Sequence, residues 1–144
     1  MRKPDTLTDL LQAGEPTRTA LSTPGGAPLS YHALRALVTR TGDALARRGI
    51  APNDRVAIVL DNGPEMAATF LSVAACATAA PLNPSYRADE FEFYLTDLKA
   101  KLIIVAQGRE SAANQVAQRL GIPLARLVAQ PEQGAGSFVL EFDD

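Results

Sequence analysis

Short apolar runs separated by helical patterns constrain the fold of this 144-residue chain more than any other feature. The runs are Arg55–Leu60, Ala80–Leu82, Lys101–Val105 and Leu124–Ala129. Most of their residues are apolar at successive positions, which is typical of parallel strands covered by helices on both faces. Because the connections are short and crossovers between parallel strands are right-handed, the pattern predicts an α/β fold with a mostly parallel sheet flanked by helices.

Helical periodicity and capping residues predict the elements around these strands. Ser30 is a good N-cap for a helix over Tyr31–Arg48, whose apolar residues recur at helical spacing and which Gly49 ends. The other predicted helices are Leu7–Ala13, one that starts at Pro64, Ala88–Leu98 and Glu110–Leu120. Ala80–Leu82, between two of these helices, is predicted to be a short buried strand.

The chain has room for one domain, which we expect to span residues 1–130. A small hairpin is predicted near residues 19–29, where two glycines permit a tight turn. Residues 131–144 are predicted to form a linker or tail, because Pro131, Gly134 and Gly136 interrupt the pattern before Phe138–Phe142.

Composition excludes several classes of protein. Apolar residues make up 47% of the chain and charged residues 21%, as in an ordinary globular protein. The net charge of −2 gives no electrostatic basis for binding nucleic acid or an anionic membrane. The longest apolar stretch, around Phe70–Leu82, is broken by Ser72 and Thr78, so no membrane span is predicted. No secretory signal is recognisable, and a cytoplasmic location is expected.

Two single residues could carry chemistry, but each has a simpler structural explanation. Cys76 is the only cysteine and lies in an Ala-rich apolar stretch without a neighbouring His or Lys, so we expect a buried, unreactive side chain. A single cysteine also excludes a disulfide framework and a zinc site built on cysteines. His32 is the only histidine and has no acidic partner three or four residues on, so a solvated or half-packed side chain is expected.

Clusters of acidic and aromatic residues near the third long helix also have structural explanations. The clusters are Asp89, Glu90 and Glu92, and Phe91, Phe93 and Tyr94. The carboxylates offset the positive end of the helix dipole, which explains them better than a paired acid/base site. Without a basic groove, the aromatic residues are predicted to be core rather than a platform for nucleotide bases.

The loops at the carboxyl ends of the strands carry no recognisable phosphate-binding motif. Asp61–Pro64 has no glycine-rich fingerprint, and Pro64 removes one amide donor, so an ordinary strand-to-helix turn is expected. Asn83-Pro84 could shape a groove or serve only to stop the preceding strand. The sequence therefore yields no catalytic, cofactor-binding or metal-binding residue.

Three stretches resemble, in order and spacing, motifs of adenylate-forming acyl-CoA synthetases. They are Leu29–Leu34 (Leu-Ser-Tyr-His-Ala-Leu), Asp54–Asn62 (Asp-Arg-Val-Ala-Ile-Val-Leu-Asp-Asn) and Val73–Pro84 (Val-Ala-Ala-Cys-Ala-Thr-Ala-Ala-Pro-Leu-Asn-Pro). The chain departs from the family pattern at Ala33, Asn53, Ala74 and Cys76, where Glu, Gly, Lys and Gly are usual. The sequence from Ala79 to Leu95 resembles the corresponding stretch of oxalate–CoA ligases.

This resemblance implies an incomplete N-terminal subdomain of the adenylate-forming fold. In the family, a carboxylate attacks ATP to give an acyl-adenylate, and the CoA thiol then displaces AMP. The implied cofactors of the full-length enzyme are ATP, Mg²⁺ and CoA. In the family, the phosphate loop and the catalytic residues lie after the N-terminal part that this chain resembles. The resemblance therefore implies no catalytic residue here, and we expect no cofactor to bind this chain alone.

Three hypotheses follow about what the chain does. The first is an N-terminal fragment of an acid–CoA ligase of fatty acid or dicarboxylate metabolism, inactive alone, with an exposed apolar face that packs on the remainder or causes self-association. The second is a standalone binding or regulatory module that pairs with a separate remainder. The third, a small nucleotide-binding domain, has no fingerprint in its favour.

Overall fold

A five-stranded sheet with the strand order β4-β3-β5-β6-β7 organises the structure, a computed structural model that describes residues 3–143. The strands are β3 (Arg55–Val59), β4 (Thr78–Pro81), β5 (Leu102–Ala106), β6 (Leu124–Ala129) and β7 (Phe138–Phe142). The first four strands are parallel to their neighbours and β7 is antiparallel to β6, so the predicted mostly parallel sheet is confirmed. A separate antiparallel hairpin contains β1 (Thr19–Leu21) and β2 (Leu29–Ser30).

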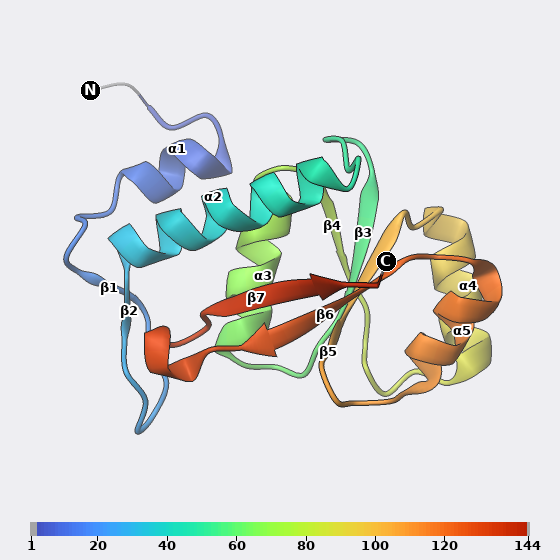
Figure 1. The fold of residues 1–144 in the computed structure, drawn as a ribbon. Helices are drawn as coiled ribbons and strands as arrows, with labels where there is room; N and C mark the ends of the chain where they lie inside the picture. The colour runs from blue at the N-terminus through green and yellow to red at the C-terminus, as the bar shows by residue number, and fades with distance from the viewer. Residues whose placement is uncertain (1–2, 144) are drawn as a thin grey trace.

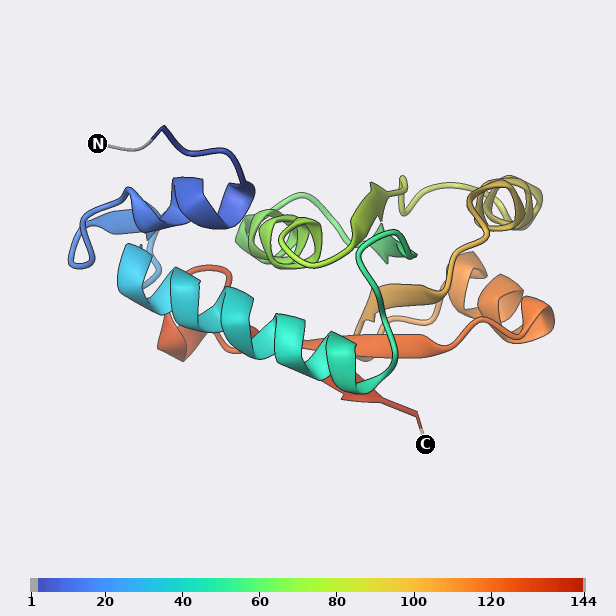
Figure 2. The same cartoon turned by 90° about the horizontal axis from the view of Figure 1, so that it is seen from above.

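Helices cover the two faces of this sheet in pairs (Figure 1, Figure 2). The helices are α1 (Leu7–Gln12), α2 (Tyr31–Arg47), α3 (Pro64–Ala74), α4 (Ala88–Leu98) and α5 (Ala112–Leu120), with a 3₁₀ turn η1 at Pro131–Gln133. Apolar residues of α2 and α3 pack on one face, against residues such as Val56, Ile58 and Ile104. Those of α4 and α5 pack on the other face, against residues such as Ala57 and Ile103. This arrangement buries both faces of β3 and β5, as their continuous apolar sequences require.

The predicted limits of the first long helix are confirmed to within a residue. The Ser30 hydroxyl accepts a hydrogen bond from the Ala33 amide at 3.1 Å, which satisfies one of the free amides of the first turn. Gly49 follows with φ of 79°, the left-handed conformation that ends the helix without side-chain strain. Leu34, Leu37 and Leu45 are almost completely buried.

The second strand is not buried, contrary to the prediction. β4 lies at the edge of the sheet, and its residues are half-buried or exposed. The amides of Thr78 and Leu82 donate to β3-side carbonyls at 2.9 Å, so alternate residues of β4 turn their backbone groups outward. Pro81 is one of these, and it has no N–H to offer at the free edge. β4 is therefore paired with a neighbouring strand on one side only. At its free edge, Pro81 leaves one backbone donor fewer for pairing with another strand.

The segment after β6, expected to be a linker or tail, packs into the structure over its described residues. Gly134–Ser137 is buried, and the Ala135 amide donates to the Ala27 carbonyl at 2.8 Å. At Gly136, where φ is 86°, an added Cβ would lie 2.6 Å from the Pro64 carbonyl oxygen, so only glycine fits. β7 then places Phe138, 1% exposed, in the core. The domain boundary expected at residue 130 of this chain stays a prediction.

The prediction that the aromatic residues of α4 are core residues is only partly right. Phe91 and Leu95 are buried, whereas Phe93 is 63% exposed and Tyr94 is 37% exposed. Tyr94 stacks instead on Tyr86, with ring centroids 5.1 Å apart. The reason is that an eleven-residue helix on an open sheet presents only one stripe to the core.

Candidate functional site

The candidate site is the crevice at the carboxyl ends of β3 and β5. These strands are neighbours, but the chain leaves β3 for α3 on one face of the sheet and leaves β5 for α5 on the other. Such a switch point opens a gap between two diverging loops, and it is where open α/β sheets bind ligands. The loops here are residues 60–63 and 107–111.

Apolar and polar side chains together line this crevice. A cavity of about 410 Å³ is bounded by Asp61, Glu65, Gln107 and the end of β6. A second cavity, of about 490 Å³, lies on the other side of the β3 loop, next to Asn83 and Pro84. Asn83-Pro84 therefore does line a groove, which is one of the two alternatives that the sequence left open.

An ion pair bridges the two loops. The Arg109 guanidinium donates to the Asp61 carboxylate across the crevice. Both side chains are more than half exposed, so the pair contributes little to stability. Sequence reasoning missed Arg109; its position just after a buried strand, at the same sheet edge as Asp61, was the available signal.

Two features of the α3 N-terminus weaken anion binding in the crevice. The N-terminus of α3 has no side-chain cap at Gly63, begins with Pro64, which lacks an N–H, and carries the acidic Glu65 in its first turn. Each of the last two features weakens anion binding at a helix N-terminus. Among the residues that the structure describes, no Lys lines either cavity.

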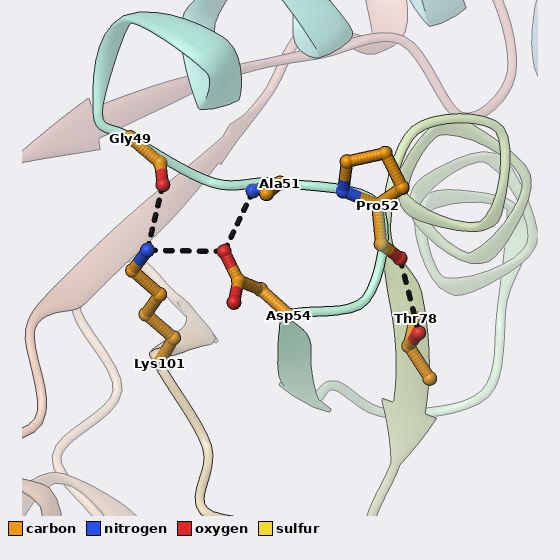
Figure 3. Close-up of polar contacts among 6 residues, drawn as sticks. All are labelled: Gly49, Ala51, Pro52, Asp54, Thr78 and Lys101. Carbon is orange, nitrogen blue, oxygen red and sulfur yellow. Dashed lines mark hydrogen bonds and ion pairs between the residues drawn. The ribbon is translucent and has the colours of Figure 1, made fainter.

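A second polar cluster lies at the opposite, amino-terminal end of the sheet (Figure 3). The Lys101 ammonium donates to the Asp54 carboxylate at 3.0 Å and to the Gly49 carbonyl at 2.7 Å. The same carboxylate oxygen accepts a hydrogen bond from the Ala51 amide at 2.6 Å. Asp54 therefore ties the turn after α2 to the start of β5.

This cluster gives the Asp-Arg-Val-Ala-Ile stretch a structural explanation. The Ala51 amide, and then Lys101, hold the pKa of the Asp54 carboxyl below its usual range. Thr78 adds a tie to β4, because its hydroxyl donates to the Pro52 carbonyl at 3.2 Å. These polar groups are hydrogen-bonded to one another at the end of the sheet remote from the crevice.

The two single residues lie apart from the crevice. Cys76 is half-buried, and burial raises the pKa of its thiol, so the thiolate that a nucleophile needs is disfavoured. Its Sγ donates to the Ser72 carbonyl at 3.5 Å. His32 is exposed on α2. The structure thus brings neither residue to a partner that would activate it among those described.

The carboxylates at the start of α4 are engaged in capping and ion pairs. Glu90 accepts a hydrogen bond from the Arg87 amide at 3.1 Å, and the Arg87 guanidinium lies 3.4 Å from Asp89. Glu92 pairs instead with Arg119 of α5 at 2.8 Å. Within residues 3–143, no three His, Cys, Asp or Glu side chains gather as metal ligands would. That the chain carries no catalytic, cofactor-binding or metal-binding residue stays a prediction.

Comparison with known proteins identifies the family. The family model described as AMP-binding enzyme matches residues 11–143. An oxalate–CoA ligase of Arabidopsis thaliana is 41% identical over 123 residues, which are 82% of this chain and 24% of that protein. An oxalate–CoA ligase of Saccharomyces cerevisiae is 35% identical over 91 residues, which are 62% of this chain and 17% of that protein. The chain thus spans about a quarter or less of the curated relatives it matches.

Solved structures agree with this assignment. ATP-bound MatB from Rhodopseudomonas palustris superposes with a TM-score of 0.74 at 25% identity, over 91% of this chain and 26% of that one. The same protein without ligand, at 22% identity, covers 96% of this chain with the same TM-score and shows the shared fold. The motifs noted in the sequence and the order of the strands therefore have one explanation: this chain belongs to the AMP-binding enzyme family.

Proposed function

We propose that this chain is the N-terminal scaffold of an ATP-dependent acid–CoA ligase and that it has no activity alone. The proposal rests on one observation. Residues 11–143 match the family, yet the chain covers only 24% of the Arabidopsis oxalate–CoA ligase. The part of such an enzyme that has no counterpart here would supply the phosphate loop and the catalytic residues.

ATP, Mg²⁺ and CoA are the cofactors implied for a complete enzyme, in which the acid is first activated as its adenylate. The crevice at β3 and β5 does not fit the triphosphate, because Pro64 and Glu65 weaken the one helix N-terminus there. Asp61 is already paired with Arg109, and only one other carboxylate among the described residues, Glu65, lines the crevice, so these residues do not supply the set of oxygen ligands that Mg²⁺ takes. No step of the reaction is therefore assigned to residues of this chain.

The role of the chain in such an enzyme would be to hold a rigid platform. The platform consists of two buried apolar layers, one on each face of β3 and β5, and of the Asp54–Lys101 tie. Rigid elements position reacting groups better than loops do, and small displacements lower rates strongly. Oxalate, named in two relatives, is the first acid to test, and a role in dicarboxylate or fatty acid metabolism in the cytoplasm stays a prediction.

Reconstitution tests this proposal. The chain would be mixed with the separately produced remainder of the Arabidopsis oxalate–CoA ligase, and CoA-thioester formation from oxalate, ATP and CoA would be measured. We expect thioester only in the mixture. If the two parts bind but no thioester forms with oxalate or with a panel of other acids, the alternative of a non-catalytic regulatory module replaces the proposal.

A further inference from the structure

A cavity of about 300 Å³ lies at the amino-terminal end of the parallel strands, remote from the crevice. Its walls come from the turn after α2, the starts of β5 and β6 and the end of β7. Its apolar lining residues are Ile50, Leu102, Pro123, Leu124 and Phe142. The two cavities of the crevice are lined by a different set of residues, so this is a separate site.

The cavity has an apolar floor because the two apolar layers of the domain end there. Leu102, 2% exposed, belongs to the layer that packs on α2 and α3, and Phe142 packs against the same layer. Leu124 packs against the layer formed with α4 and α5. Phe142 and Leu124 are only half-buried, so an apolar group in the cavity would cover apolar area that water now contacts.

Two cations line the same cavity. The Arg48 guanidinium carbon lies 4.4 Å from the centroid of the Phe142 ring, a cation–π contact that holds the charge beside the apolar floor. The Lys101 ammonium has three N–H donors, and its hydrogen bonds to Asp54 and Gly49 use two of them (Figure 3). Within the described part of the chain, one donor is therefore left for a ligand carboxylate.

The charges of the lining favour an anion. Asp143 also lines the cavity, but its carboxylate is paired with Arg126, which lowers its pKa and keeps it ionised. Arg126 lies outside the lining, as do Glu110 and Glu141, which act on it electrostatically. Two cations and one carboxylate that already has a partner leave the lining with a net charge of +1.

We propose that this cavity binds an apolar monocarboxylate, with its hydrocarbon on the floor and its carboxylate at Arg48 and Lys101. At roughly 30 Å³ for each water-sized group, the cavity holds about ten non-hydrogen atoms, which is the size of octanoate. Guanidinium and ammonium groups recognise a carboxylate through charge-assisted hydrogen bonds. The proposal is independent of the proposed function, because no residue of the crevice takes part in it.

Calorimetry of the whole chain with three ligands of one chain length tests the proposal. The ligands are octanoate, the uncharged octanamide and the cationic octylamine. We expect octanoate to bind with a Kd of about 1 mM or lower, octanamide at least about tenfold more weakly, and octylamine not at all. No binding of octanoate would overturn the site, and equal binding of octanoate and octanamide would overturn the role of the cations.

A pair of neighbouring arginines provides a matched control. Arg48→Gln removes a cation from the cavity and should weaken octanoate binding by at least about fivefold. Arg47→Gln removes an exposed cation that lines a groove on α2 instead, and should leave the Kd unchanged. Equal binding by the two variants would overturn the assignment of the carboxylate to Arg48.

Methyl NMR of the unmodified chain locates the ligand without any substitution. Octanoate should shift the methyl signals of Ile50, Leu102 and Leu124, which line the cavity, and should leave those of Leu60 in the crevice unchanged. Shifts at Leu60 without shifts at the three cavity residues would place the ligand in the crevice and overturn the proposal.

Discussion

Phe138→Ala tests whether β7 is part of the folded unit or an appended tail. Phe138 is 1% exposed and lies in the apolar layer under α2 and α3. Truncation of a fully buried Phe to Ala typically lowers the free energy of unfolding by about 3–5 kcal/mol, through lost burial and the cavity left behind. Because small domains are stable by only about 5–15 kcal/mol, this loss would be a large fraction of the total. The hydrogen bond from Arg40 to the Phe138 carbonyl, at 3.3 Å, is to the backbone and survives the substitution.

Urea unfolding followed by circular dichroism measures this loss. With an m-value of about 1–3 kcal/mol/M, the expected change lowers the midpoint by about 2 M, or unfolds the chain outright. Phe93→Ala is the matched control, since the same side chain is removed from a 63% exposed position and should change stability by less than about 0.5 kcal/mol. A loss below about 1 kcal/mol for Phe138→Ala would refute the packing of β7 described above.

Three further predictions concern the backbone, the acid limit of stability and the thiol. Gly136→Ala should destabilise by about 1–3 kcal/mol in the same urea assay, because of its φ of 86° and the nearby carbonyl, and clearly more than Gly25→Ala, where φ is 75° but the space is open. Equal effects would contradict the close approach. The lowered pKa of Asp54 means that its contribution to stability is complete above the unfolded-state pKa, about 3.9, and is lost as the pH falls through the folded-state pKa, so Asp54→Asn should flatten the pH dependence below about pH 4. An unchanged slope would contradict the contacts of that carboxylate. Cys76 should react with a thiol reagent at pH 8 far more slowly in the folded chain than in urea, because burial raises its pKa, and equal rates would contradict that burial.

Elements with local signals were predictable from the sequence. The apolar runs at residues 55–60 and 101–105 are buried only if both faces of their strands are covered by other elements. The N-cap at Ser30 depends on residues next to it in the sequence. The prediction of strands and helices therefore holds for the centre of the fold.

Features that depend on distant parts of the chain were not predictable in this way. The position of β4 at an edge depends on which strand pairs with β3 on each side, and no local pattern encodes that choice. The burial of Gly134–Ser137 depends on contacts with the hairpin and with Pro64, so glycines that indicated a linker instead permit close packing. Similarly, Arg109 acquires a partner only because β3 and β5 are adjacent.

The central claim is that this chain is a scaffold whose chemistry lies elsewhere, and AMP formation by the purified chain tests it most directly. The chain would be incubated with ATP, Mg²⁺, CoA and oxalate, then with a panel of other acids, and AMP and pyrophosphate would be quantified. Addition of the Arabidopsis remainder to a parallel sample provides the comparison. The account predicts no AMP above background from the chain alone and AMP with pyrophosphate in the mixture. Repeated turnover of ATP to AMP by the chain alone, dependent on an added acid, would contradict it.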